Sequence, residues 1–249
     1  EVIEDNNRKL VSSDLVLENG KYHIDFEDLE AKIVDNHVKL FLLCSPHNPV
    51  GRVWTEDELD RLGNVCKKHG VIAFSDEIHS DFVWVGRHTV FQEVDASFKE
   101  FTITATAPSK TFNLAGLQQS NIFIANKKIR DRFEEEYTIT GLDEPNIAGI
   151  VAAKAAYTYG DEWYENMKKY VKANIDFTVE YVKNNLPGVK MNSPEGTYLV
   201  WLDFNALKLD EKELEDRIVN KAGLWLDAGR IFGKSGCGFE RINVATQRS

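Results

Sequence analysis

Short apolar runs alternate with helical or long crossover segments through the middle of the chain, and this alternation is the feature that most constrains its fold. Runs with the length of buried strands lie at residues 38–44, 71–74, 101–105 and 121–125. Strands that follow one another through helices or long crossovers favour a parallel sheet that is covered on both faces. The sequence therefore predicts an α/β fold with a large, mostly parallel sheet and flanking helices.

The segment between the first two runs carries the start and stop signals of a helix. Thr55 and Glu58 have the spacing of a capping box, in which each side chain accepts a hydrogen bond at the start of the helix. Gly70 is a usual C-terminal stop. A helix is therefore expected to begin after Thr55 and to end at about His69.

The second part of the chain has a different pattern. Helical stretches are expected at about residues 144–158 and 161–185. Beyond them, strands are expected at residues 197–204, 224–227 and 241–245, with a helix at residues 210–221. We therefore expect two domains. Residues 1–160 form the C-terminal portion of a large sheet domain, and residues 161–249 form a smaller α+β domain that is attached through the long helix.

Composition and charge argue against several classes of function. The formal net charge is −10, whereas a nucleic-acid-binding surface needs a clustered basic face. No apolar run approaches the ~20 residues that span a membrane, and the histidines show no metal-ligand spacing. Cys44, Cys66 and Cys237 are scattered, which favours a reduced, cytoplasmic compartment over a disulfide framework or a zinc site.

Three polar side chains follow three of the predicted strands. Asn48 lies just past the first strand, Asp76 lies at the end of the second, and Lys110 follows the third. Ligands of open parallel α/β sheets bind at the carboxyl ends of the strands. An amide, a carboxylate and an amine are therefore expected to converge at one edge of one sheet.

These are the groups that pyridoxal 5'-phosphate (PLP) needs. A lysine forms a Schiff base with its aldehyde, and a carboxylate keeps the pyridine nitrogen protonated, so that the ring accepts electrons from the substrate's Cα. An amide can donate to the phenolate oxygen. Near the end of the chain, Arg241 can bind an α-carboxylate through two hydrogen bonds. Hydroxyl groups for the phosphate are available at Thr104, Thr106 and Ser109.

Each of these residues also has an ordinary structural interpretation. A lone lysine after a strand is usually a solvated surface residue, and an aspartate at a strand end is often a helix N-cap. Asn48 can simply begin a turn, and Arg241 can be a structural ion-pair partner. His79 can stack near the cofactor, bond to Asp76, or be a buried histidine outside the site. The combination, at successive strand ends, favours the PLP site.

Three segments carry a resemblance to a known family. Residues 45–51 read Ser-Pro-His-Asn-Pro-Val-Gly, residues 75–79 read Ser-Asp-Glu-Ile-His, and residues 107–113 read Ala-Pro-Ser-Lys-Thr-Phe-Asn. They resemble the fold-type I PLP enzymes of the class I/II aminotransferase family, and within it the MalY/PatB-type cystathionine β-lyases, which are C–S β-lyases. The resemblance extends over essentially the whole chain.

The resemblance implies a role for each candidate residue. Lys110 is the Schiff-base lysine, and Asp76 is the partner of the pyridinium nitrogen. Asn48 contacts the phenolate oxygen, and Arg241 binds the substrate carboxylate. His79 and Ser109 complete the expected cofactor-binding set.

Some features depart from the wider family. Gln118 stands where many aspartate-type aminotransferases have an arginine, and His79 stands where they have a tyrosine; both differences are similar to the β-lyase subgroup. The chain opens without Met at Glu1 and stops soon after Arg241. It is therefore expected to lack the family's N-terminal segment, which supplies an aromatic residue that stacks on the ring, and the C-terminal helix. By itself the fragment is expected to bind PLP weakly.

Three functions remain as hypotheses. The first is a PLP-dependent C–S β-lyase, which converts cystathionine or a cysteine-type amino acid into pyruvate, ammonia and a thiol. The second is an aminotransferase that uses the same site, and the third is a non-catalytic regulator domain that reuses the fold. The resemblance implies a homodimer with a small amino acid as substrate. A nicotinamide dehydrogenase has no support, because no Gly-x-Gly-x-x-Gly segment follows a strand.

Overall fold

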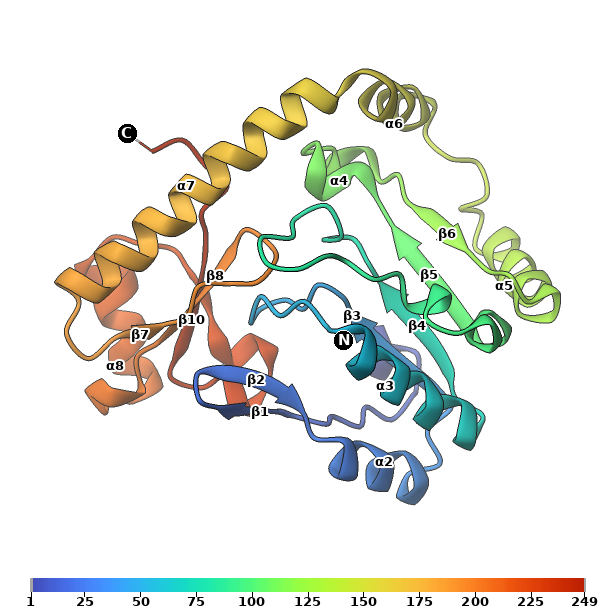
Figure 1. The fold of residues 1–249 in the computed structure, drawn as a ribbon, viewed down its shortest axis with the longest axis horizontal. Coiled ribbons are helices and arrows are strands. Elements are labelled where there is room, and N and C mark those ends of the chain that lie inside the picture. The colour runs from blue at the N-terminus through green and yellow to red at the C-terminus, as the bar shows by residue number, and fades with distance from the viewer. Residues whose placement is uncertain (1, 249) are drawn as a thin grey trace.

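The computed structural model describes residues 2–248, and residues 1 and 249, which end the two predicted domains, lie outside the described range. The fold is built around two four-stranded sheets that lie side by side, and the long helix α7 (Asp161–Asn185) runs along one of them (Figure 1). A two-stranded hairpin, β1 (Leu15–Glu18) and β2 (Lys21–Ile24), completes the strands. An α/β architecture is therefore confirmed, and the four-stranded sheet with the longer strands is called the larger sheet below, the other the smaller sheet.

The larger sheet has the strand order β3-β4-β5-β6. Its strands are β3 (Leu40–Cys44), β4 (Ile72–Asp76), β5 (Thr102–Thr106) and β6 (Asn121–Phe123). The first three strands are parallel, but β6 pairs with β5 in the antiparallel sense. The connection from β5 to β6 stays at the carboxyl edge of the sheet, so the chain re-enters the sheet from that edge and runs back. A further parallel strand would have required a crossover to the opposite edge.

One face of the larger sheet carries the main hydrophobic core. Helices α2 (Phe26–Asp35) and α3 (Glu56–His69) pack there, and the buried cluster includes Leu43, Leu59 and Phe98. On the other face, Leu40 and Leu42 are half exposed, at 50% and 52%. The prediction of cover on both faces is thus wrong for β3 within the described residues. Strand β3 has apolar side chains on both faces of the sheet, whereas α2 and α3 cover only the face that carries the main core.

The predicted start and stop of α3 are both present. Thr55 accepts from the Glu58 N–H while the Glu58 side chain accepts from the Thr55 N–H, which is the capping box that the sequence predicts. The helix ends at Gly70, which has a left-handed conformation with φ +63°. The long helix predicted at about residues 161–185 is also confirmed, as α7.

The smaller sheet is antiparallel throughout, with the order β7-β8-β10-β9. Its strands are β7 (Lys190–Met191), β8 (Leu199–Asp203), β9 (Asp227–Ala228) and β10 (Phe239–Asn243). Val171 and Ile175 of α7 pack against Val200 and Leu202 of β8 in a second core cluster. The long helix therefore belongs to the smaller sheet's core as well as linking the two sheets.

The remaining helices are short or peripheral. They are α1 (Val2–Asp5), α4 (Pro108–Thr111), α5 (Lys127–Ile139), α6 (Ile147–Tyr159) and α8 (Glu211–Glu215). The helix predicted at residues 210–221 continues beyond α8 as a π-helical turn, Asp216–Lys221. The strand predicted at residues 224–227 is wrong over most of its length. β9 begins at Asp227, where it first finds a partner in β10.

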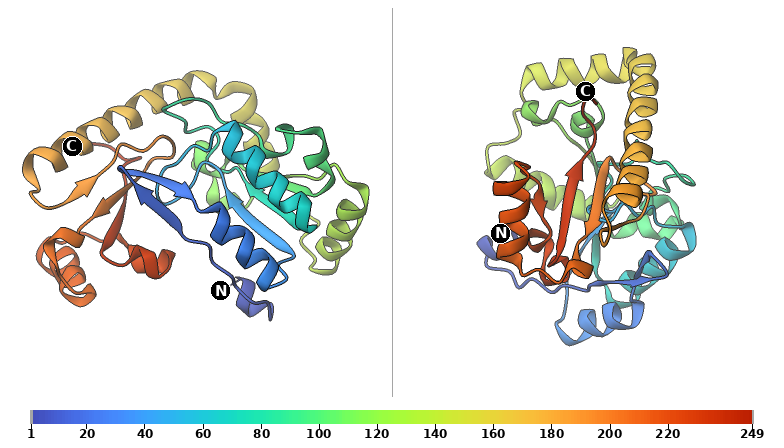
Figure 2. Two further views of the ribbon diagram at one scale, coloured as in Figure 1. Left: turned by 60° about the horizontal axis from the view of Figure 1, so that its bottom comes forward. Right: turned by 90° about the vertical axis from the view of Figure 1, so that its left-hand side faces the viewer.

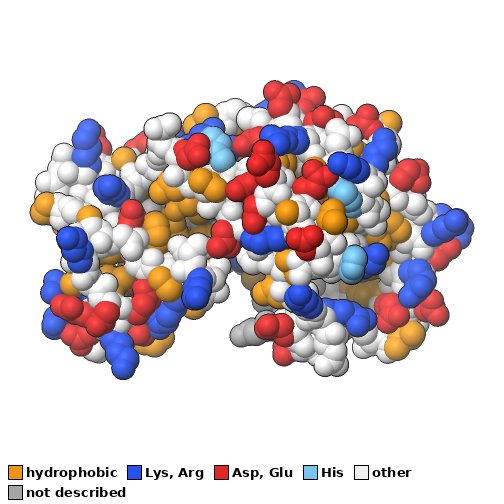
Figure 3. All heavy atoms as spheres, turned by 90° about the horizontal axis from the view of Figure 1, so that it is seen from below, with side chains coloured by type: hydrophobic (Ala, Val, Ile, Leu, Met, Phe, Trp, Pro, Cys, Tyr) orange, Lys and Arg blue, Asp and Glu red, His pale blue; other side chains and the backbone are white. Residues whose placement is uncertain are grey.

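Acidic and basic side chains are interspersed over the face shown in Figure 3, without a basic cluster. Within residues 2–248, no helix combines the length and the apolar character that crossing a membrane requires. The β1–β2 hairpin reaches from α2 towards the smaller sheet (Figure 2), where Asn192 donates to the carbonyl of Gly20. The hairpin therefore contacts both halves of the fold.

Candidate active site

The register of the larger sheet places Asp76 at its carboxyl edge. Asp76 is the last residue of β4, and it pairs with Cys44 on β3 and with Ala105 on β5. Lys110 lies in α4, the single-turn helix that follows β5. Because the three strands are parallel, their carboxyl ends lie together. The structure therefore brings Lys110 to the edge that Asp76 occupies, as the sequence predicts.

The charge on Lys110 reaches the Asp76 carboxyl group. Burial raises the pKa of Asp76 above its ordinary value, and the N–H of Ile78 and the positive charge of Lys110 offset part of that rise. The Ile78 N–H donates to Oδ1 of Asp76 at 3.1 Å. The arrangement leaves a partly buried carboxyl group that favours a further cation or hydrogen-bond donor.

Asn48 and Arg241 meet although 193 residues separate them. Nη1 of Arg241 donates to Oδ1 of Asn48 at 2.7 Å. Asn48 lies in the loop after β3, where its own N–H donates to the Cys44 sulfur at 3.5 Å. Arg241 lies in β10 of the smaller sheet. The candidate site is therefore formed across the junction of the two sheets.

Arg241 is also an ion-pair partner, which was the alternative interpretation of this residue. Its Nη2 and Nε atoms donate to Oδ2 of Asp227, at 2.6 and 3.1 Å. The guanidinium carbon lies 4.7 Å from the centroid of the Phe232 ring. Asp227, Asn48 and Phe232 together fix the guanidinium plane. A fixed plane suits the two-pronged recognition of a carboxylate.

His79 lies close to both Lys110 and Arg241, whose charges act on its ring. It is 3% exposed, and its ring meets Tyr198 edge-on with 5.6 Å between centroids. Burial, with the nearby charges of Lys110 and Arg241, lowers the pKa of His79 to about 4. The ring is therefore neutral at pH 7. Among the described residues it forms no hydrogen bond with Asp76, which was one of the three interpretations of this histidine, and its Nδ1 atom has no partner.

The hydroxyl groups proposed for a phosphate lie in different environments. Ser109 is half-buried in α4, next to Lys110. Thr106 accepts a hydrogen bond from Asn121 at 3.4 Å. Thr104 pairs with Ser75 rather than with Asp76, so the alternation of the strand directs it to the buried face. Of these residues, Ser109 is the one that the fold places best for the site, and Thr104 is not brought to it.

Two residues that adjoin the site were not predicted from the sequence. Tyr198 was included only in an expected strand, and it contacts both His79 and Phe82 edge-on. Asp227 was likewise the end of an expected strand, yet it is the carboxylate partner of Arg241. The available sequence signal for Tyr198 and Asp227 was an aromatic or acidic residue near the end of an expected strand. Such residues are too common to indicate a functional site.

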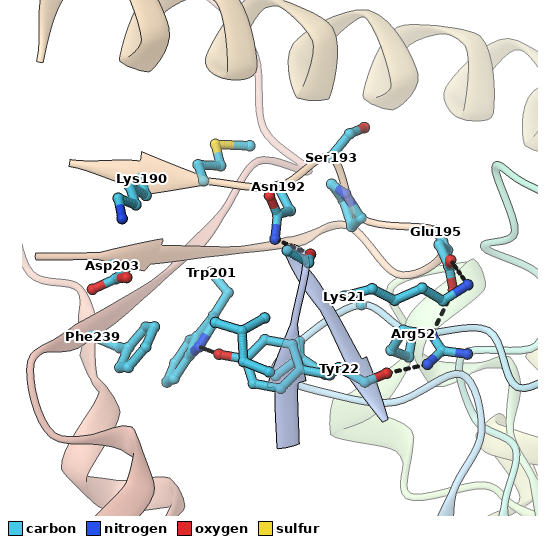
Figure 4. Close-up of a pocket in the computed structure, with 16 residues that line it drawn as sticks. Lys21, Tyr22, Arg52, Lys190, Asn192, Ser193, Glu195, Trp201, Asp203 and Phe239 are labelled. Atoms are coloured by element: carbon cyan, nitrogen blue, oxygen red, sulfur yellow. Dashed lines mark hydrogen bonds and ion pairs between the residues drawn. The ribbon is translucent and has the colours of Figure 1, made fainter. Parts of the chain in front are cut away.

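A separate cavity of about 370 Å³ lies between the hairpin and the smaller sheet (Figure 4). Trp201 and Phe239 stack on one side of it, with ring centroids 5.0 Å apart, and Tyr22 faces them from the hairpin. None of the six predicted site residues lines this cavity. The candidate site is therefore the edge formed by Asp76 and Lys110 rather than this cavity.

The fold is that of a known class of protein. The family model for aminotransferase class I and II matches residues 2–249, and the chain belongs to that family. Among curated relatives, the chain is 41% identical over 244 residues to the cystathionine beta-lyase PatB of Bacillus subtilis. The matched region covers 98% of the chain and 63% of PatB. It is 32% identical over 248 residues to the protein MalY of Escherichia coli, which covers 99% of the chain and 63% of MalY.

Solved structures agree with this assignment. Cystalysin from Treponema denticola, which contains PLP, superposes with a TM-score of 0.95 at 42% identity, over 98% of the chain and 62% of cystalysin. The PLP-bound C-S lyase from Staphylococcus hominis gives a TM-score of 0.89 at 32% identity, over 98% of the chain and 63% of that enzyme. The chain thus spans about 63% of the length of the curated relatives it matches.

Proposed function

We propose that the protein carrying this chain is a C–S β-lyase that uses PLP to release a thiol from cystathionine or another cysteine-type amino acid, with pyruvate and ammonia as the other products. One observation carries the proposal. Lys110 and Asp76 gather with Arg241 at one edge of the larger sheet, in a chain that is 41% identical to a cystathionine β-lyase.

The polar groups at this edge fit PLP. Within the described residues, Asp76 accepts one hydrogen bond, and the Nδ1 atom of the buried His79 has no partner. Asn48 uses Oδ1 for Arg241, so its NH₂ group is available to donate to the cofactor's phenolate oxygen. PLP, when bound, supplies an electron sink for the negative charge that develops at the amino acid's Cα.

Lys110 and Asp76 carry the proton chemistry in this proposal. The Lys110 amine would hold the cofactor through its aldehyde, and it would serve as the base for the Cα proton of the substrate. Asp76 would hold the ring nitrogen of the cofactor in its protonated form. Burial raises the pKa of Asp76, and a cationic ring nitrogen beside it favours the carboxylate form.

The other residues bind and orient. Arg241, held by Asn48 and Asp227, binds the α-carboxylate of the substrate. Ser109 would donate a hydrogen bond to the phosphate of the cofactor. His79, whose pKa is lowered to about 4 by burial first and then by the charges of Lys110 and Arg241, contacts the cofactor as a neutral ring.

We also propose that the whole protein is a cytoplasmic homodimer built from the two domains that the sequence predicts, with the boundary near residue 160. The two buried clusters, one under each sheet, support the division. The three cysteines are free thiols, which supports a reducing compartment. Helix α6 supports the dimer, because its apolar residues Ile147 and Val151 are 77% and 62% exposed.

The decisive experiment is an assay of the purified protein with L-cystathionine. Pyruvate and a thiol should form together without an added keto acid. If a keto acid forms only when an amino-group acceptor is added, and no thiol appears, the protein is an aminotransferase instead.

Lys110→Ala should abolish the covalent link to PLP and lower turnover by about a thousandfold or more, because the amine and the base are lost together. Visible absorption after dialysis reports the link, and pyruvate release reports turnover. Lys127→Ala, at an exposed position in α5, is the matched control and should behave as the wild type. Retention of the covalent link in Lys110→Ala would contradict the assignment.

A further inference from the structure

Arg52 is a buried cation at the meeting point of three parts of the fold. The residue is 3% exposed, and its guanidinium carbon lies 4.7 Å from the centroid of the Trp54 ring. Nη1 donates to the Tyr22 carbonyl of the hairpin, Nη2 donates to both oxygens of Glu58 at 3.0 and 2.8 Å, and Nε donates to Glu195 at 2.8 Å. A guanidinium so far from water needs this pairing.

The two carboxylates that bind Arg52 belong to different parts of the molecule. Glu58 lies in α3, six residues along the chain from Arg52, whereas Glu195 lies 143 residues away in the turn before β8. Glu195 also accepts from the Val53 N–H at 3.1 Å, and its other oxygen lies 2.8 Å from the Lys21 ammonium (Figure 4). Of the two carboxylates, Glu195 is therefore the one that joins the larger sheet to the smaller sheet.

The turn that carries Glu195 contacts the loop after β3 through its backbone as well. The N–H groups of Glu195 and Gly196 both donate to the carbonyl of Gly51, at 2.8 and 2.9 Å. Gly51 has φ +71°, a left-handed conformation that suits glycine. The side-chain and backbone contacts together fix how the turn lies on this loop.

The same loop carries Asn48 to the candidate site. The His47 N–H donates to the Arg52 carbonyl at 2.7 Å, and the Gly51 N–H donates to the His47 carbonyl at 2.8 Å. Asn48 lies inside the loop that these bonds close, and its side chain meets Arg241 of the smaller sheet at 2.7 Å. A shift of the turn against the loop would therefore move these two side chains relative to each other.

We propose that the Arg52–Glu195 pair is a positioning device for the active site, which sets how the smaller sheet docks on the loop after β3 and so holds Asn48 and Arg241 in register for a substrate carboxylate. Arg52 and Glu195 contact no reacting atom in this role. The effect on substrate binding rests on the proposed function, whereas the docking of the turn on the loop does not.

The test compares Glu195→Gln with Glu58→Gln in the holoenzyme of the protein carrying this chain. Both substitutions remove one negative charge from the same guanidinium, and Gln still serves in the capping box of α3. The measurements are the KM and kcat for L-cystathionine, the inhibition constant of acetate as a probe of Arg241, and hydrogen exchange of the backbone amides in residues 45–53 and 192–197. Glu195→Ala is the second, more severe variant.

Glu195→Gln should raise the KM and the acetate inhibition constant by about fivefold or more, with a smaller change in kcat. It should also speed hydrogen exchange in both segments. Glu58→Gln should lower the melting temperature and leave the KM unchanged. Equal effects of the two variants on KM, or unchanged exchange in Glu195→Ala, would overturn the proposal. If Glu195→Gln speeds hydrogen exchange but the protein does not cleave cystathionine, the positioning role is supported and the lyase proposal is rejected.

Discussion

Glu240 is a buried carboxyl group that precedes Arg241 in β10, and the site does not use it. It is 4% exposed. Its pKa is raised to about 7, by burial first and then by the acidic neighbours Glu211, Glu215 and Asp227, while Arg230 acts in the opposite direction. The folded protein therefore holds this proton at a pH at which the unfolded chain has already released it.

The sign of the pH effect follows from that difference. Below pH 4.5, the ordinary pKa of a Glu, both the folded and the unfolded states are protonated, and the native stability is complete. As the pH rises towards 7 the unfolded chain ionises first, so the folded state loses stability, and above 7 the loss is complete. Because glutamine cannot ionise, Glu240→Gln should abolish this loss of stability at high pH.

We therefore expect Glu240→Gln to raise the free energy of unfolding by about 1–3 kcal/mol at pH 8 and to change it little at pH 4. Thermal melting at the two pH values measures this. Glu134→Gln, at an exposed position in α5, controls for the general loss of a negative charge. An equal gain for Glu240→Gln at both pH values would show that burial of the ionised carboxyl group is not the cause.

At the scale of the elements, Gly63 shows how packing overrides helix propensity. It lies inside α3, and a Cβ atom added there would overlap the ring of Phe98. Phe98 is fully buried and stacks with Phe91, with 5.4 Å between ring centroids, so the ring has little freedom to move. At an exposed helix position, alanine stabilises the fold by about 1 kcal/mol relative to glycine. At Gly63 the overlap with the Phe98 ring outweighs this gain.

Gly63→Ala should therefore destabilise the protein by about 1–3 kcal/mol, as overpacked cores do. Asn64→Ala is the matched control, since Asn64 is the next residue of α3 and is exposed. It should be neutral or slightly stabilising. Urea unfolding followed by circular dichroism compares the two variants. A Gly63→Ala variant as stable as Asn64→Ala would mean that the Phe98 ring moves aside at little cost.

The elements that sequence predicted well are those whose signals are local. The capping box of Thr55 and Glu58 and the stop at Gly70 lie at the two ends of α3, and Asp76 and Lys110 lie at or just after strands that are marked by short runs of apolar or β-branched residues. The direction of β6 has no such local signal, because it depends on the path of the preceding connection. This explains why the site's edge was predicted in advance and the antiparallel strand was not.

The contacts across the two sheets could not be predicted for a related reason. Tyr198 contacts His79 across the junction of the two sheets, whereas Asp227 meets Arg241 because β9 pairs with β10. Tyr198 and His79 lie far apart in the sequence, and no spacing rule connects them. Arg241 was predicted through a resemblance in sequence, while its partner Asp227 needed the structure.

At the scale of the whole molecule, α6 is the element whose environment is least complete. Its residues are almost all apolar, yet of the helix only Gly149 and Ala153 are buried. It lies at the outer margin of the fold, at the far end of α7 (Figures 1 and 2). A helix that is apolar on all sides is normally buried, so in a homodimer this helix is the surface that a second copy would cover.

Ile147→Lys combined with Val151→Lys places two charges, one helical turn apart, on this surface. Charges buried at an interface without partners weaken it strongly, so the variant should dissociate at least about tenfold more readily than the wild type. Sedimentation velocity over a range of protein concentrations measures the change. Val34→Lys replaces an apolar residue that is 47% exposed on α2, remote in sequence from α6, and should leave the assembly unchanged. A variant that assembles like the wild type would exclude α6 from the interface, and a monomeric wild type would reject the homodimer.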